Sequence, residues 1–245
     1  MPRIYLSPSL QEFNLYNGGG NEALYMRQVA AAMIPYLRAN GIQFTISSPG
    51  MTLTQVIAQS NSSTYDLHLA LHSNAAPPGT AGTVQGTEVY YYPTSTRGRR
   101  FAEILAANMR NIYINPANVR VIPNANMAEL RRTKAPAVLL ETAYHDNATD
   151  AQWIRDNIEL IAKTIVVALT QYFGIPFVES SAARIGTVVT MGGNLNIRSQ
   201  PNTLSSVVTR APNGAQLIVY STVGDWYLVG YCNETGYAFS RYVLV

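Results

Sequence analysis

Short apolar runs alternate with longer amphipathic stretches over residues 1 to about 178. Runs of this length, bounded by polar residues, are typical of strands buried on both faces. They predict strands at Arg3–Ser7, Ile42–Ser47, Leu67–His72, Gly86–Tyr92 (as an edge strand) and Ala137–Glu141. The amphipathic stretches predict helices at Ala23–Ala39, Thr52–Ser62, Arg99–Asn111 and Ala151–Phe173. This alternation predicts an α/β fold, with a mostly parallel sheet covered by helices.

The pattern changes after residue 178. Residues 179–184 are small and polar, as in a linker, and from Ile185 onward only short apolar stretches remain, separated by turn-forming residues. Such spacing is typical of a small all-β barrel. We therefore expect an α/β domain over 1–176, a linker over 177–184 and a β-domain over 185–245.

Composition excludes several classes of protein. Of the 245 residues, 47% are hydrophobic and 13% charged, which indicates a folded chain, and the net charge of +3 with no basic stripe argues against binding of nucleic acid. Cys232 is the single cysteine, so an intrachain disulfide or a cysteine-based zinc site is excluded. No apolar run is long enough for membrane insertion, and the first residues lack a signal-peptide pattern. We expect synthesis in the cytoplasm.

Candidate chemistry lies where two predicted strands end. One strand ends on His72 and another on Glu141, and the carboxyl ends of parallel strands are where ligands bind in open α/β sheets. Glu22 begins a helix soon after the first strand, where a carboxylate is also favoured by the helix dipole. An imidazole and two carboxylates at one sheet edge are candidate metal ligands and a candidate general base.

These segments resemble the zinc-dependent N-acetylmuramoyl-L-alanine amidases of the Amidase_3 type. The resemblance covers about residues 1–174 and is carried by Glu22, by Leu-His-Ser-Asn at 71–74 and by Leu140-Glu141. It implies that Glu22 and His72 hold Zn²⁺, that Glu141 is the catalytic base and that Asn74 binds substrate. The implied reaction is metal-dependent hydrolysis of the amide between N-acetylmuramic acid and L-alanine in peptidoglycan.

One ligand of the family pattern is missing. The family usually reads Asp-Pro-Gly-His-Gly after the first strand, whereas this chain has Leu10 at the histidine position. The neighbouring Gln11 could supply a carbonyl oxygen, a weak zinc donor, and His145 is the alternative third ligand. His68 is expected to be structural, because at ~3.3 Å per strand residue its Cα lies ~13 Å from that of His72.

The last quarter of the chain, about residues 185–245, resembles a bacterial SH3 (SH3b) domain. The likeness is carried by 193–199 (Gly-Asn-Leu-Asn-Ile-Arg-Ser), by 224–227 (Gly-Asp-Trp-Tyr) and by 235–237 (Thr-Gly-Tyr). It implies binding to the cell wall. Most aromatic residues here are expected to pack the small barrel, and Trp226 and Tyr227 are the candidates for wall contact.

The resulting hypothesis is a peptidoglycan hydrolase, an endolysin or autolysin, targeted by its SH3b domain. We expect it to act at the bacterial wall after release from the cytoplasm, with peptidoglycan as its partner; the oligomeric state stays open. Two alternatives remain: a non-catalytic peptidoglycan-binding protein with a degenerate metal site, and another metallo-peptidase of the cell wall.

Overall fold

A computed structural model describes residues 1–180 and 183–245 of the chain. Its contacts divide the chain into two compact units, one built mainly from Arg3–Ile34 and Phe44–Pro176, the other mainly from Phe177–Val245. The predicted linker 177–184 includes residues 181 and 182, which lie outside the described residues.

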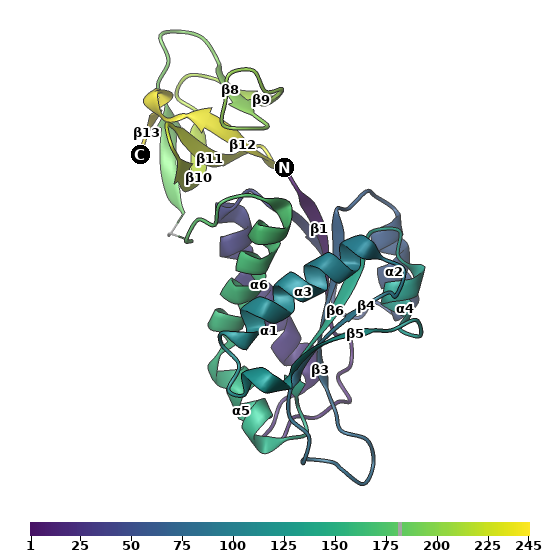
Figure 1. The fold of residues 1–245 in the computed structure, drawn as a ribbon. Coiled ribbons are helices and arrows are strands. Elements are labelled where there is room, and N and C mark those ends of the chain that lie inside the picture. Colours follow the sequence, from purple (N-terminus) through teal and green to yellow (C-terminus); the bar gives the residue numbers. More distant parts are fainter. Residues whose placement is uncertain (181–182) are drawn as a thin grey trace. The chain divides into compact units, whose positions relative to one another are not determined.

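The first unit is a six-stranded sheet with helices on both faces (Figure 1). Its strands are β1 (Arg3–Pro8), β2 (Gln43–Ile46), β3 (Leu67–Asn74), β4 (Thr87–Tyr91), β5 (Val119–Pro123) and β6 (Ala137–Tyr144). Its helices are α1 (Glu22–Ala39), α2 (Leu53–Asn61), α3 (Thr96–Arg110), α4 (Ala128–Arg132), α5 (Ala148–Asp156) and α6 (Ile158–Phe173), with a 3₁₀ turn at Pro116–Asn118.

The strand order is β2-β1-β3-β6-β4-β5. Strand β3 pairs in parallel with β1 and with β6, and β4 pairs in parallel with β5, whereas β4 and β6 are antiparallel. The mostly parallel α/β sheet predicted from the hydrophobic pattern is confirmed.

Helix boundaries follow local chemistry. The Asn21 side chain accepts a hydrogen bond from Leu24 N at 2.8 Å, capping the start of α1 and placing Glu22 in its first turn. Pro35 does not end the helix, which continues to Ala39. Gly41 follows with φ of 65°, the left-handed conformation that favours glycine just past a helix end.

Two expectations about elements are wrong, and two elements were not predicted. Strand β4 is not at an edge, because β5, which the pattern did not predict, covers its outer side. The single helix predicted over Ala151–Phe173 begins earlier and is broken at Asn157 into α5 and α6. The short helix α4, just before β6, was also not predicted.

One face of the sheet packs against α2 and α4. Tyr5, His68, Ala70 and Leu139 are paired across β1, β3 and β6 and therefore share a face. Tyr5 packs with Val56 of α2, while Ala70 and Leu139 form a cluster with a residue of α4. Figure 1 shows α1, α3 and α6 on the other side of the sheet.

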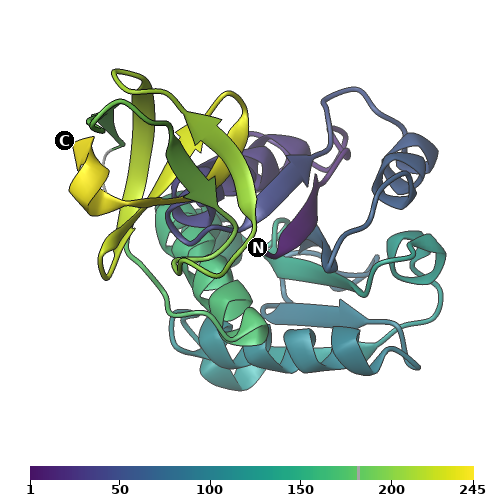
Figure 2. The ribbon, with the colours of Figure 1, turned by 90° about the horizontal axis from the view of Figure 1, so that it is seen from above.

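The second unit is an antiparallel barrel whose strands curve around a small core (Figure 2). Its strands are β7 (Arg184–Val188), β8 (Leu195–Arg198), β9 (Val207–Ala211), β10 (Gln216–Val223), β11 (Trp226–Tyr231), β12 (Glu234–Phe239) and β13 (Val243–Leu244), with a 3₁₀ turn at Ser240–Tyr242. Cys232 and Asn233 have φ of 48° and 64° and form the two-residue turn from β11 to β12. The predicted all-β fold is confirmed.

The barrel core is small and apolar. Ile197, Val219, Val229 and Ala238 are each at most 1% exposed and pack together. The described residues hold no helix with the length and apolar character needed to cross a membrane.

Candidate functional site

A row of polar side chains crosses one face of the sheet near the carboxyl ends of β3 and β6. His72 of β3 pairs with Glu141 of β6, Glu141 with Glu88 of β4, and Glu88 with Arg120 of β5. Paired positions share a face, so four neighbouring strands deliver one imidazole, two carboxylates and one guanidinium to a single line. The sheet therefore brings the predicted His72 and Glu141 together.

Glu22 joins His72 from the first turn of α1. Glu22 Oε1 lies 2.8 Å from His72 Nδ1, and Glu22 is only 1% exposed. Burial disfavours the carboxylate, but hydrogen bonds from His72 and Asn14 outweigh it and lower the pKa of Glu22. Burial likewise opposes the charged ring of His72, yet the Glu129 and Glu22 carboxylates raise the pKa of His72 to about 10.

Gln11 reaches the same ring from the loop after β1. Its Nε2 lies 3.3 Å from His72 Nδ1, and its Oε1 accepts a hydrogen bond from Asn14 Nδ2 at 3.0 Å. Asn14 Nδ2 also donates to Glu22 Oε2 at 2.6 Å. Asn14, which the sequence analysis missed, thus ties the amide of Gln11 to the carboxylate of Glu22.

His145, the alternative third ligand, is engaged elsewhere. Its Nδ1 lies 2.8 Å from the carbonyl oxygen of Ser73 and 3.1 Å from the Ser73 hydroxyl, and its ring stacks on Tyr16. The structure brings Gln11 close to His72 and Glu22. The ring of His145 instead contacts Ser73, the residue that follows His72 in β3.

Glu141 has the most unusual environment of these groups. Its Oε2 is buried and has no hydrogen-bond partner among the described residues. Burial, together with the negative charges of Glu22 and Glu88, raises the pKa of Glu141 to about 7, although the charge of His72 opposes the shift. A carboxyl poised near neutrality is suited to accept a proton.

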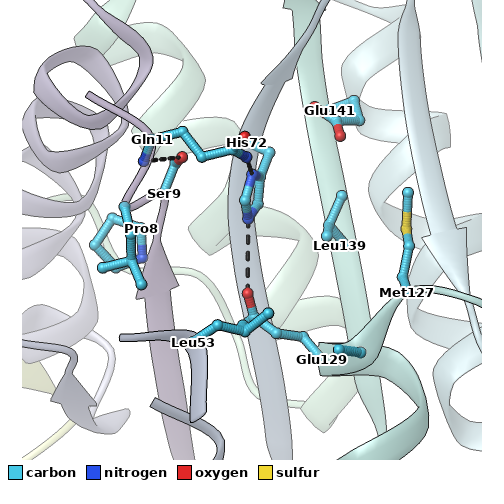
Figure 3. Close-up of a pocket in the computed structure, with 11 residues that line it drawn as sticks. Pro8, Ser9, Gln11, Leu53, His72, Met127, Glu129, Leu139 and Glu141 are labelled. Carbon is cyan, nitrogen blue, oxygen red and sulfur yellow. Dashed lines mark hydrogen bonds and ion pairs between the residues drawn. The ribbon is translucent and has the colours of Figure 1, made fainter. Parts of the chain in front are cut away.

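A cavity of about 360 Å³ opens beside these groups (Figure 3). Its polar lining is contributed by Ser9, Gln11, His72, Glu129 and Glu141. Its apolar lining is contributed by Pro8, Leu10, Leu53, Met127, Ala128 and Leu139. The cavity is thus mostly apolar with a few convergent polar groups, which is the usual composition of a ligand site.

The sequence analysis also missed Glu129 of α4. Its Oε2 lies 2.7 Å from Nε2 of His68, and its Oε1 lies 3.7 Å from Nε2 of His72. Burial opposes the charge of Glu129, but the two histidines lower the pKa of the carboxyl well below its usual range. Nothing in the local pattern marks this residue, because the fold alone brings α4 against β3.

Asn74, predicted to bind substrate, uses its side chain within the protein. Its Nδ2 donates to Glu88 Oε2 at 2.9 Å, and its Oδ1 accepts from Ala75 N at 2.9 Å. Glu88 also accepts hydrogen bonds from Tyr90 and Arg120, so its carboxylate is fully surrounded by donors.

The donor set supports a metal ion through two strong ligands and one weak one. Glu22 and Gln11 both converge on Nδ1 of His72, and imidazole and carboxylate are donors that zinc prefers. Gln11 presents its nitrogen, so its amide has to turn before the oxygen can coordinate. Among the described residues no group of three or more His, Cys, Asp or Glu side chains is arranged to hold a metal.

The barrel has a cavity of its own, of about 580 Å³. Trp226, Phe239 and Tyr242 line it together with Arg198 and Asn196. The ring centroids of Trp226 and Phe239 are 5.2 Å apart at an interplanar angle of 68°. This edge-to-face pair fixes one aromatic wall of the groove.

The two predicted wall-binding residues differ in their surroundings. Trp226 lines the groove, whereas Tyr227 packs against the barrel core.

Two family models match this arrangement of an α/β sheet, with a His–Glu pair near its carboxyl edge, followed by a small β-barrel. Residues 12–171 match the family described as N-acetylmuramoyl-L-alanine amidase (Amidase_3), and residues 193–243 match the bacterial SH3 domain. The chain therefore belongs to the N-acetylmuramoyl-L-alanine amidase family, and the predicted resemblance is confirmed. Members of this family are generally zinc-dependent.

Individual relatives agree with this assignment. The probable cell wall amidase LytH of Staphylococcus aureus is 30% identical over 144 residues, which are 55% of this chain and 47% of the relative. The chain thus spans about half the length of the curated relatives it matches. Among solved structures, the amidase AmiC2 of Nostoc punctiforme superposes with a TM-score of 0.63 at 18% identity, covering 71% of this chain and 97% of that one.

A second solved structure has the same fold. The catalytic domain of the CD27L endolysin, which targets Clostridia difficile, superposes with a TM-score of 0.58 at 22% identity and covers 70% of this chain and 98% of that one. At these identities the likeness shows the α/β fold.

Proposed function

We propose that the protein is a metal-dependent N-acetylmuramoyl-L-alanine amidase that hydrolyses the amide between the lactyl group of N-acetylmuramic acid and L-alanine. One observation carries the proposal: Glu141 lines a cavity together with His72, and its buried Oε2 has no hydrogen-bond partner in the described part of the chain. Family membership supplies the substrate class. Amide hydrolysis needs a group that takes a proton from water and returns it to the leaving amine, and we assign both transfers to Glu141.

Glu22, His72 and Gln11 would hold the metal, the last through its amide oxygen. A bound zinc ion supplies a Lewis acid that polarises the scissile carbonyl and lowers the pKa of water. Asn14 keeps its hydrogen bond to Glu22 Oε2 and so leaves Oε1 directed at His72. Glu141 provides the proton transfer from the neighbouring strand.

The apolar lining of the cavity suits this substrate. Leu10, Met127 and Leu139 form a surface beside His72 and Glu141. The lactyl and alanyl units on either side of the scissile bond each carry one methyl group. Burying these methyl groups contributes about 0.8 kcal/mol each, and fixes the carbonyl relative to Glu141.

The test is metal content combined with release of peptide from purified peptidoglycan, before and after chelation. We expect near-stoichiometric zinc, peptide release by the purified protein, loss of release after chelation and recovery when zinc is restored. Glu103 is exposed and pairs with Arg99 on its own helix, so Glu103→Gln serves as a control with unchanged activity. Absence of metal together with absence of release after added zinc would contradict the proposal and favour a wall-binding protein without catalysis.

We further propose that the barrel binds the cell wall, where the enzyme would act after release from the cytoplasm. The match to the bacterial SH3 family and the aromatic groove support this role. Trp226 offers a flat apolar surface, and Arg198 and Asn196 supply hydrogen-bond donors at the same groove. Such a groove suits a wall peptide or glycan. Joining a hydrolase to a binder raises the local concentration of enzyme at its substrate.

A further inference from the structure

A single buried carboxylate connects two histidines of strand β3. His68 and His72 are four residues apart on one face of the strand, too far apart to bind the same ion. Glu129 of α4 bridges that gap, because its Oε2 lies 2.7 Å from His68 Nε2. Its Oε1 lies 3.7 Å from His72 Nε2, the contact drawn in Figure 3. The carboxylate therefore faces the edge of the His72 ring opposite to Glu22.

His68 is itself held on every side. Its Nδ1 lies 2.9 Å from the hydroxyl of Ser60, its ring stacks on Tyr5 with a centroid separation of 5.2 Å, and it is 0% exposed. The helix α4 also anchors Glu129, whose carbonyl accepts a hydrogen bond from Thr133 at 2.6 Å. The carboxylate of Glu129 is thus held by His68, which does not line the cavity.

We propose that Glu129, held by His68, is a positioning residue that fixes the ring of His72. This inference rests on the proposed function. When one ring nitrogen of a histidine donates its proton to a carboxylate, the orientation of the ring is fixed. The other nitrogen is then available to bind a metal. Here the carboxylate faces Nε2, so Nδ1 is presented to Glu22 and Gln11. His68 acts on His72 through Glu129.

The test compares Glu129→Gln, His68→Phe and the double variant with the wild type. Phenylalanine keeps a flat ring against Tyr5 but removes both polar contacts of His68. Two properties are measured: kcat and KM for peptide release by the zinc-loaded enzyme, and the ¹⁵N signals of the His72 ring in metal-free protein. The chain has three histidines, so each ring is assigned by single substitution. Glu103→Gln is the matched control for loss of one carboxylate.

We expect each single variant to change the His72 ring signals and to lower kcat about 10–100-fold, the usual effect of removing a partner of a metal ligand. The change in KM should stay within about threefold, because Glu129 acts on His72 and not on substrate affinity. The double variant should be no worse than Glu129→Gln alone, since both changes break one chain of contacts. His68→Gln, which keeps a donor toward Glu129, should restore much of the wild-type signal.

Two results would overturn the inference. Wild-type His72 signals in Glu129→Gln would show that the carboxylate does not orient the ring. Loss of activity in Glu129→Gln, with His68→Phe unchanged in both measurements, would show that Glu129 acts without His68. Should the wild type release no peptide, the proposed function fails, while the ¹⁵N signals of the metal-free variants still decide whether Glu129 orients His72.

Discussion

Glu88 and Glu141 are directly opposed on the antiparallel strands β4 and β6, yet their carboxylates have opposite environments. Glu88 is surrounded by donors from Asn74, Tyr90 and Arg120, whereas Glu141 Oε2 has no partner among the described residues. The negative charge of Glu88 is one cause of the raised pKa of Glu141. Neighbouring carboxylates whose surroundings differ in this way are a recurring arrangement in acid–base sites.

Glu141→Gln is expected to stabilise the metal-free protein at pH 8. Because the pKa of Glu141 rises from 4.5 to about 7 on folding, the folded state binds the proton more tightly. Its contribution is therefore present below pH 4.5 and is lost as the pH rises through about 7. Glutamine does not ionise, so the variant is not destabilised as the pH rises. Its free energy of unfolding at pH 8 should therefore exceed that of the wild type by about 1–3 kcal/mol.

Urea unfolding at pH 4 and pH 8 measures this difference. The gain should shrink toward zero at pH 4, and Glu103→Gln, an exposed carboxylate, should show no gain at either pH. A variant less stable than the wild type at pH 8 would mean that the ionised Glu141 is compensated in the folded protein.

The rate of hydrolysis should depend on pH through Glu141. A general base works only when ionised, so activity is expected to rise with pH through an acid limb that reports the pKa of Glu141. That pKa is about 7 in the metal-free protein, and a bound cation would lower it, so the limb of the zinc-loaded enzyme is expected below pH 7. Steady-state rates from pH 5 to 9 provide the measurement, and a rate that falls steadily as the pH rises from 5 would contradict the role of Glu141.

Asn74→Ala should lower stability. The side chain of Asn74 donates to the buried Glu88, and removing that donor leaves one carboxylate oxygen less satisfied. The expected loss is about 1–2 kcal/mol in free energy of unfolding, or a fall of a few degrees in Tm. Asn126→Ala is the control, because that residue is an exposed loop asparagine. Unchanged stability with a raised KM would instead return Asn74 to the substrate-binding role first predicted.

The sequence alone predicted those parts of the site that lie on long, regular elements. His72 and Glu141 end apolar runs whose strand character is unmistakable, so the sheet edge they share followed from topology. Glu22 followed from its place at a helix start. The placement of Gln11 near His72 agrees with the loop position assigned to it, whereas the position of His145 depended on a loop whose path the pattern does not determine.

The missed residues are those whose role depends on packing between distant segments. Glu129 lies on a five-residue helix with no periodic signal, and only the folded chain sets it against His68 and His72. The break at Asn157 was missed because apolar residues continue on both sides of it. Strand β5 was missed because its buried and exposed positions do not alternate.

Trp226→Ala should weaken binding of the protein to purified cell walls. The indole forms one wall of the barrel groove and packs against Phe239, so its removal takes away the largest apolar contact there. Truncating a central aromatic anchor of a binding surface costs about 2 kcal/mol, which corresponds to a thirtyfold weaker affinity. Co-sedimentation with insoluble peptidoglycan measures it, with Ile218→Ala as a control at an exposed barrel residue. Equal sedimentation of both variants would exclude the groove as the binding surface.

The most direct test of the amidase reaction is the chemistry of the fragments that the enzyme releases. Purified peptidoglycan is digested with the zinc-loaded wild type and with Glu141→Gln, and the products are identified by mass spectrometry and N-terminal labelling. We predict free stem peptides beginning with L-alanine, intact glycan strands and at least a hundredfold less product from Glu141→Gln. Fragments cut within the peptide would instead identify a wall peptidase, and equal product from both proteins would contradict the assignment of Glu141 as the base.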